Sequence, residues 1–136
     1  MDDIEAIKQV QARFLRAADT RDTDLIRTTV IDDFYCDTGS GGRGETQGIE
    51  AFVVRIASTP ALAVHHALMP EIALTGPDAA QGTWAVHMFA KTIDGTAVDG
   101  YGYYDNTYVR IDGAWRLATL RLSWLHRESR PGQPAA

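Results

Sequence analysis

Residues 97–126 have the sequence AVDGYGYYDNTYVRIDGAWRLATLRLSWLH. Polar and apolar side chains alternate along residues 97–111 and again along residues 114–126, as they do in strands with one buried face. Asp112-Gly113 separates the two segments, and an Asp-Gly pair between alternating segments is a strong signal for a tight hairpin turn. The stretch therefore predicts two long antiparallel strands that pair with each other.

The same pattern extends the predicted sheet toward the N-terminus. Asp94-Gly95 is a second turn signal, and it precedes the strand at 97–111 and follows an alternating segment at 79–91. A further strand is predicted over 61–75, which Pro70 can interrupt. A short strand at 34–37 precedes a glycine-rich loop, so the sheet is expected to have four to six strands.

Helical periodicity is confined to the first part of the chain. Apolar residues recur at helical spacing over residues 3–18, and Asp22 is suited to cap a second helix over 23–30. A third helix is predicted over 49–57. Helices followed by a meander of strands indicate an α+β fold, with three helices packed on a curved, mostly antiparallel sheet. We expect one domain over 1–127 and a disordered C-terminal tail over 128–136.

Composition narrows the class of protein. The chain has 136 residues, of which 45% are hydrophobic, and a net charge of −5, so neither nucleic acid nor an acidic membrane is expected as a partner. Cys36 is the single cysteine, which excludes an intrachain disulfide and a cysteine-based metal site. With no apolar signal segment at the N-terminus, the expected location is the cytoplasm.

Three segments carry a resemblance to a known family: AADTRDTDLIRTTV (17–30), VHH (64–66) and GYYDNTYVRIDGAW (102–115). In this order they resemble the SnoaL-like branch of the nuclear transport factor 2-like superfamily over about residues 3–127. The resemblance implies a cystatin-like α+β cone. It is nearest to scytalone dehydratase, bile acid dehydratase and hexachlorocyclohexane dehydrochlorinase, in a branch that also holds polyketide cyclases and ketosteroid isomerase-like enzymes.

The resemblance implies a catalytic pair, because the Asp and His of these enzymes fall on Asp19 and His65. A neutral imidazole can remove a proton from carbon, and a carboxylate behind it fixes the tautomer. Such chemistry needs neither a metal nor a cofactor. Two positions depart from the family: Phe14 replaces a tyrosine of the bile acid dehydratases, and Leu120 replaces an arginine of the dehydrochlorinase. Dehydrochlorination is therefore not the favoured reaction.

Strand periodicity separates the histidines. His65 shares a face with two alanines, which leaves room for a ligand, whereas His66 points to the opposite face, toward helices or a partner subunit. Counting from His65 also places His87 on the face away from the pocket. Without the resemblance, Asp19 is more typical of a turn residue, and a strand histidine such as His65 is more often half-buried and not catalytic.

Parity also predicts the residues that line the pocket, and their types suggest its ligand. Tyr103 is expected to supply the hydroxyl group that Phe14 lacks. The same aromatic residues are also what an ordinary core would contain. An apolar lining favours a small, hydrophobic, cyclic or polyketide-like substrate. The predicted lining residues are Phe14, Trp84, Val86, Met88, Tyr103, Leu120, Leu122 and Trp124.

Three hypotheses for function follow. The first is a cofactor-free, dehydratase-like lyase or isomerase in which His65 is the acid and base and Asp19 orients it. The second is a polyketide cyclase or ketosteroid isomerase-like enzyme with Asp19 as the base. The third is a binding or assembly module without catalysis, which a dyad separated by more than about 6 Å or a filled pocket would favour. A homodimer or homotrimer that packs through the sheet is expected in each case.

Overall fold

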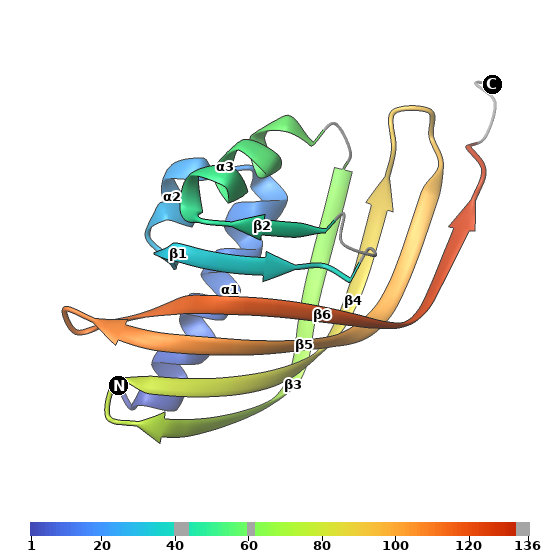
Figure 1. The fold of residues 1–136 in the computed structure, drawn as a ribbon. Helices are drawn as coiled ribbons and strands as arrows, with labels where there is room; N and C mark the ends of the chain where they lie inside the picture. The colour runs from blue at the N-terminus through green and yellow to red at the C-terminus, as the bar shows by residue number, and fades with distance from the viewer. Residues whose placement is uncertain (40–43, 60–61, 133–136) are drawn as a thin grey trace.

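In the computed structural model, which describes residues 1–39, 44–59 and 62–132, three helices pack against a curved six-stranded sheet (Figure 1). The elements are α1 (Asp3–Thr20), α2 (Thr23–Arg27), β1 (Val30–Asp37), β2 (Glu45–Gln47), α3 (Ile49–Ser58), β3 (Leu62–Gly76), β4 (Ala79–Lys91), β5 (Ala97–Ile111) and β6 (Ala114–Arg130). The strand order is β2-β1-β6-β5-β4-β3, with β1 and β6 parallel and all other pairs antiparallel. The predicted α+β cone is confirmed.

Both hairpin turns form where the Asp-Gly pairs predict them. Asp112 and Gly113 have φ values of 52° and 80°, and positive φ at both positions gives the turn a twist that matches its strands. Gly95 has a φ of 86° between β4 and β5. The strand ends predicted on either side of these turns, at residues 91, 97, 111 and 114, are therefore also found in the structure.

The first two helices are set by caps at their ends. The side chain of Asp2 accepts a hydrogen bond from the Glu5 N–H at 2.7 Å, and Asp22 accepts one from the Leu25 N–H at 3.0 Å. Arg21 ends α1 in the left-handed conformation, with a φ of 56°. The second helix was predicted to reach residue 30 but ends at Arg27, because Val30 already belongs to β1.

Other boundaries differ from the predictions where local signals are weak. Strand β1 starts four residues before the predicted residue 34, and the short strand β2 was missed inside the glycine-rich segment. β6 continues to Arg130, where it pairs with Ala97, so the beginning of the predicted disordered tail is strand. Pro70 does not end β3, although the pairing register with β4 shifts around it. Residues 61 and 133–136, and residues 40–43 of the glycine-rich loop, lie outside the described residues.

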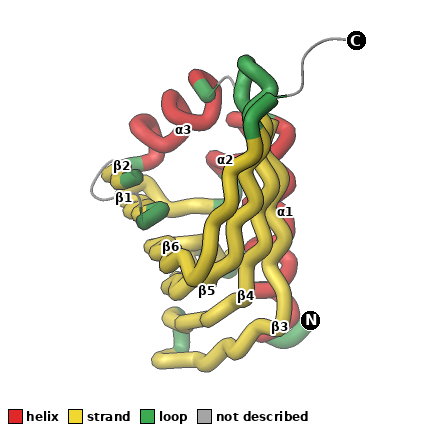
Figure 2. The backbone as a smooth tube through the Cα atoms, turned by 90° about the vertical axis from the view of Figure 1, so that its right-hand side faces the viewer, coloured by secondary structure: helices red, strands yellow, loops and turns green. Residues whose placement is uncertain are grey.

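The sheet bends sharply along β5 and β6, as Figure 2 shows from the side. Tyr101 pairs with His126 and the next residue pairs with Trp124, so Leu125 is an extra residue in β6. Gly100 faces the indole of Trp124 at this point, and a Cβ there would lie 2.4 Å from the ring. The glycine thus allows the close approach that curves the sheet around the helices.

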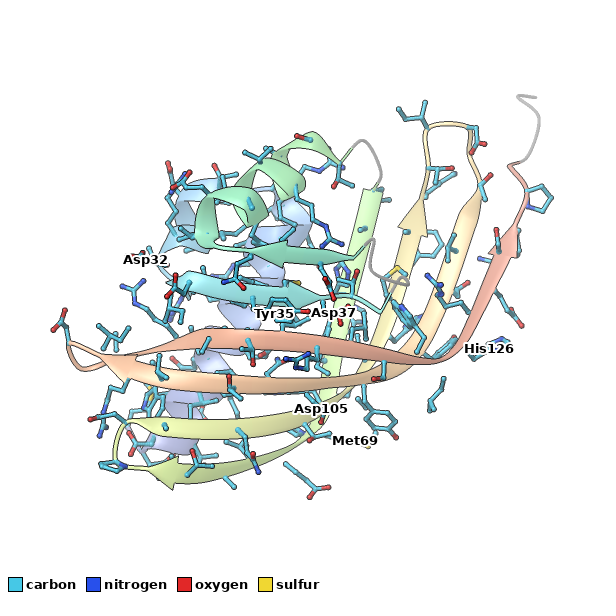
Figure 3. The ribbon with its side chains drawn as sticks, in the orientation of Figure 1. Asp32, Tyr35, Asp37, Met69, Asp105 and His126 are labelled. Atoms are coloured by element: carbon cyan, nitrogen blue, oxygen red, sulfur yellow. The ribbon has the colours of Figure 1, made fainter. Side chains whose placement is uncertain are left out.

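The core lies between this concave face and the helices. Phe14 from α1, Phe34 from β1 and Phe52 from α3 meet with ring centroids 5.1–5.7 Å apart. The other face of the sheet carries polar and exposed side chains such as Asp105 and His126 (Figure 3). In the described part of the chain, none of the helices is long and apolar enough to span a membrane.

Candidate active site

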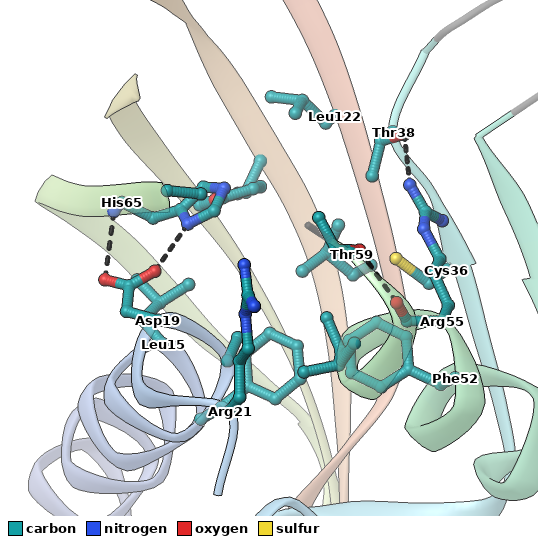
Figure 4. Close-up of a pocket in the computed structure, with 16 residues that line it drawn as sticks. Leu15, Asp19, Arg21, Cys36, Thr38, Phe52, Arg55, Thr59, His65 and Leu122 are labelled. Carbon is teal, nitrogen blue, oxygen red and sulfur yellow. Dashed lines mark hydrogen bonds and ion pairs between the residues drawn. The ribbon is translucent and has the colours of Figure 1, made fainter. Parts of the chain in front are cut away.

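A cavity of about 210 Å³ opens between the C-terminal end of α1, α3 and the concave face of the sheet. Figure 4 shows Asp19 and His65 on one side of it and Arg55 and Thr38 on the other, with the side chain of Arg21 between them. The remaining lining is largely apolar and comes mainly from α1 and α3 and from β1, β3, β5 and β6. The cavity is therefore an extension of the core that stays unfilled by side chains.

Asp19 and His65 are held together by two hydrogen bonds. The Nδ1 atom of His65 lies 2.7 Å from Oδ1 of Asp19, and the backbone N–H of His65 donates to Oδ2 at 3.1 Å. A carboxylate can only accept, so Nδ1 carries the ring proton and Nε2 is left as the basic nitrogen. The side chains of His65 and Asp19 are 27% and 20% exposed, which keeps the pair reachable from the cavity.

The local structure explains how residues 46 positions apart meet. Asp19 lies in the last turn of α1, just before Arg21 ends the helix, and His65 lies near the beginning of β3. Contacts between α1 and β3 bring the two together. Ala63 lines the cavity on the same face as His65. The small side chain leaves space above the imidazole, as the sequence predicts.

The outer face of the sheet holds the other two histidines that the sequence analysis considered. His66 pairs with His87 across β3 and β4, and their rings are 6.2 Å apart. His87 stacks on Tyr101 at 4.7 Å and lies 3.3 Å from a carboxylate oxygen of Asp99. Both histidines are thus directed away from the cavity, in agreement with the parity argument.

Of the predicted lining residues, Phe14, Leu120 and Leu122 line the cavity. Trp84 and Val86 face the same side of the sheet but are buried deeper, and the indole N–H of Trp84 donates to the Tyr108 hydroxyl at 2.9 Å. These two residues therefore do not line the cavity.

Met88 and Trp124 are two further corrections. Met88 pairs with His65 across β3 and β4 and shares its face, yet it does not reach the cavity. Trp124 covers Gly100, and its indole N–H donates to the Thr38 carbonyl oxygen at 3.1 Å. The predicted parity is right for both residues. Packing against the backbone at Gly100 and Thr38 keeps Trp124 out of the cavity lining.

Tyr103 is also wrong as a lining residue, because it is 43% exposed on the outer face. Its neighbour Tyr104 lines the cavity instead. The inward positions of β5 alternate through Gly100, Gly102 and Tyr104. Two of these have no side chain, so the alternation visible in the sequence favoured the outward tyrosines.

Two arginines in the cavity were missed by the sequence analysis. Arg21 follows Asp19 by two residues, and Arg55 lies one helical turn after Phe52 on α3, a spacing that could have identified it. Arg55 donates to the carbonyl oxygen of Gly44 at 2.8 Å and to the hydroxyl of Thr38 at 3.1 Å. The lining thus carries two guanidinium groups and one carboxylate in a chain of net charge −5.

Cys36 also lines the cavity, but its thiol is not an activated nucleophile. Burial raises the pKa of Cys36 to about 11, and the nearby Arg55 offsets only part of this increase. The thiol is therefore neutral at physiological pH. Among the described residues, no group of three or more His, Cys, Asp or Glu side chains is arranged to hold a metal ion.

The raised pKa predicts a slow reaction of Cys36 with thiol reagents. At pH 8 roughly one thiol in a thousand is ionised, against roughly a quarter in an unfolded chain. We expect 5,5′-dithiobis(2-nitrobenzoic acid) to react more than about 100-fold faster in denaturing urea than with the native protein. The native rate should rise as the pH is raised toward 11. Equal rates in both states would contradict the burial of this thiol.

Comparisons with known proteins agree with this architecture. The SnoaL-like domain family model matches residues 1–121. A type 2 hexachlorocyclohexane dehydrochlorinase is 19% identical, with a TM-score of 0.84 over 97% of this chain and 91% of that chain. A proposed scytalone dehydratase from Novosphingobium aromaticivorans DSM 12444 is 17% identical, with a TM-score of 0.80 over 96% and 91%. A nuclear transport factor 2-like protein from Cytophaga hutchinsonii is 16% identical, with a TM-score of 0.78 over 92% and 100%.

Proposed function

Because the chain belongs to the SnoaL-like domain family, whose fold it shares, we propose that it is a cofactor-free lyase or isomerase of the dehydratase type. The hydrogen-bonded pair of Asp19 and His65 at the edge of a cavity is the observation that carries this proposal. Two solved structures with this fold are named for eliminations, one of hydrogen chloride and one of water. The proposed location remains the cytoplasm.

In the proposed reaction, Nε2 of His65 removes a proton from a carbon atom next to an activating carbonyl group. Asp19 holds the imidazole in the required tautomer and stabilises the imidazolium that forms. The imidazolium then returns the proton, either to a departing hydroxyl group or to another carbon. Elimination of water and isomerisation therefore differ only in where the second proton transfer ends.

The cavity supports a small substrate. Its volume of about 210 Å³ is below the range of roughly 300–1,000 Å³ typical of sites for drug-sized ligands. Aromatic and aliphatic side chains, among them Phe14, Phe52 and Leu122, form much of its wall. A compound with one ring fits this space, and a larger polyketide-like substrate would have to extend beyond the mouth.

A direct test uses 3-hydroxycyclohexanone, a one-ring β-hydroxy ketone. Loss of water gives cyclohex-2-enone, which is followed by its ultraviolet absorbance. Exchange of the protons next to the carbonyl is measured separately by NMR in D₂O with cyclohexanone, which cannot eliminate water. Enone formation by the wild type supports a lyase, and exchange alone supports an isomerase. If the wild type catalyses neither reaction faster than a His65→Ala variant does, the proposal is contradicted.

The second hypothesis, in which Asp19 itself is the base of a cyclase or ketosteroid isomerase-like enzyme, is less well supported. Both carboxylate oxygens of Asp19 are already engaged by His65, one by the ring and one by the backbone N–H. Each oxygen therefore already accepts a hydrogen bond within the dyad and is less available to take a proton from a substrate. The third hypothesis, a module without catalysis, expects a separated dyad or a filled pocket, whereas the distance is 2.7 Å and a cavity is present.

We also propose that the chain forms a homodimer or homotrimer through the outer face of the sheet. This face exposes three large apolar side chains, those of Leu68 (51% exposed), Tyr101 (47%) and Tyr103 (43%). Contact with a second copy of the chain would cover them. Light scattering during size exclusion is expected to give two or three chains per particle. A Tyr103→Arg variant should shift this to one chain, while Ile93→Arg in the β4–β5 turn should not. A monomeric wild type would contradict the proposal.

A further inference from the structure

Tyr104 has the features of a residue that acts on a molecule in the cavity. It is 2% exposed, and it is one of the residues that line the cavity with Asp19 and His65. In the part of the chain that the structure describes, no hydrogen bond reaches its hydroxyl group. The hydroxyl oxygen is not among the fully enclosed polar atoms that lack a partner, so it reaches the cavity and is available to a ligand there.

Tyr108 provides a comparison within the same strand. It lies on the same face of β5 and is fully buried. Its hydroxyl donates to Gln11 Oε1 at 2.7 Å and accepts from the indole N–H of Trp84 at 2.9 Å. The fold therefore satisfies one buried tyrosine completely with protein groups and leaves the other, which faces the cavity, without one.

The protonation state of Tyr104 suits a hydrogen-bond donor. Burial raises the pKa of Tyr104 far above its usual value, and the carboxylate of Asp19 adds to this effect. The phenol is therefore protonated at every physiological pH. It can donate its proton in a hydrogen bond to an oxygen atom, whereas a role as a base is excluded.

We propose that Tyr104 is a catalytic residue whose hydroxyl donates a hydrogen bond to the carbonyl oxygen of the substrate. The substrate is consequently a small β-hydroxy ketone or a related carbonyl compound. This inference rests on the proposed function. His65 takes the proton from the carbon next to the carbonyl, and the electrons of the C–H bond move to the oxygen held by Tyr104. The enolate then re-forms the carbonyl and expels the β-hydroxyl, which leaves as water with the proton from His65. The products are an enone and water.

The role that the sequence suggested for Tyr103 is thus transferred to its neighbour. Tyr103 is directed outward, whereas Tyr104 pairs with Leu122 across β5 and β6, and both of these line the cavity. The part of the wall that β5 and β6 form therefore offers the neutral hydroxyl of Tyr104 beside the apolar side chains of Leu120 and Leu122. A hydrogen-bond donor in such an apolar setting suits a carbonyl oxygen on an otherwise apolar ligand.

The experiment compares acetophenone with α-methylstyrene, which has nearly the same shape but no oxygen. Binding is measured by calorimetry, and the carbonyl stretch of bound acetophenone by infrared difference spectroscopy. We expect the wild type to bind the ketone about three- to tenfold more tightly than Tyr104→Phe, with equal affinities of the two proteins for the alkene. The carbonyl stretch should lie at lower wavenumber in the wild type than in the variant.

Melting temperatures distinguish a structural role of Tyr104 from the proposed role in binding the carbonyl oxygen of the substrate. Tyr104→Phe is expected to keep or raise the melting temperature, because no protein hydrogen bond is lost. The matched variant Tyr108→Phe should lower it, since Gln11 and Trp84 lose a buried partner, and should bind acetophenone like the wild type. Equal affinity of the wild type for ketone and alkene, including no binding of either, overturns the inference. So does an unchanged carbonyl stretch in Tyr104→Phe.

These outcomes are independent of the test of the proposed function. Ketone binding and the infrared shift are measured without turnover, and they can be repeated in a His65→Ala background. If Tyr104→Phe leaves binding unchanged while His65→Ala abolishes elimination, the inference fails and the proposed function remains. If the ketone binds through Tyr104 but neither elimination nor exchange occurs, the proposed function fails.

Discussion

Replacing His65 with alanine is expected to lower the rate of enone formation from 3-hydroxycyclohexanone by about 10²- to 10⁴-fold, the usual contribution of a general acid–base group. The variant loses Nε2, the basic nitrogen that the hydrogen bond to Asp19 leaves available. The β3 backbone does not depend on the ring, so the fold should persist. Initial rates are measured by absorbance, and folding is checked by circular dichroism.

His66 provides a matched control for this substitution. It is adjacent in sequence and of the same type, but it is exposed on the opposite face of β3. His66→Ala removes the same atoms from the same strand, and we expect its rate to stay within about twofold of the wild type, as for a surface substitution away from the site. If both variants lose the same fraction of the rate of enone formation, the cause would be a change in the strand and not the removal of a catalytic group.

Replacing Phe34 with alanine is expected to lower the free energy of unfolding by about 3–5 kcal/mol. Phe34 is fully buried, and its ring contacts Phe14 and Phe52 edge-on at centroid distances of 5.7 and 5.1 Å. Both of these partners line the cavity. The substitution therefore leaves a hole directly behind the binding surface, and ligand affinity should fall together with stability.

Urea unfolding followed by fluorescence measures this loss. Ile93 is the control, because it is a large apolar residue that is 81% exposed in the β4–β5 turn, and Ile93→Ala should change the free energy of unfolding by no more than about 0.5 kcal/mol. A loss below about 1 kcal/mol for Phe34→Ala would show that the aromatic cluster is not the centre of the core.

The parts of the fold that the sequence predicts are those with strong local signals. A two-residue type I′ hairpin turn requires positive φ at both central positions, and Asp112-Gly113 adopts it. The short strand β2 could not be predicted, because its three residues are held by pairing with β1 and have little pattern of their own. The extension of β6 to Arg130 likewise depends on its partner β5, which is remote from those residues in sequence.

The candidate site was predictable in a similarly uneven way. Strand parity alone places His65 and His66 on opposite faces, but the pairing with Asp19 required the family resemblance, because a contact across 46 residues leaves no local trace. The lining of β5 was assigned to the wrong tyrosine, since glycines at the inward positions hide the alternation. Arg21 lines the cavity because it ends α1 in the left-handed conformation. The sequence carries no signal for this conformation at an arginine.

The central claim is that Asp19 and His65 act as one catalytic unit, and a double-mutant cycle tests it most directly. Enone formation from 3-hydroxycyclohexanone is measured for the wild type, Asp19→Asn, His65→Ala and the double variant. Residues that act as a unit are strongly non-additive, so the double variant should be no slower than His65→Ala by more than about twofold. Losses that multiply, or a His65→Ala variant as fast as the wild type, would contradict the claim.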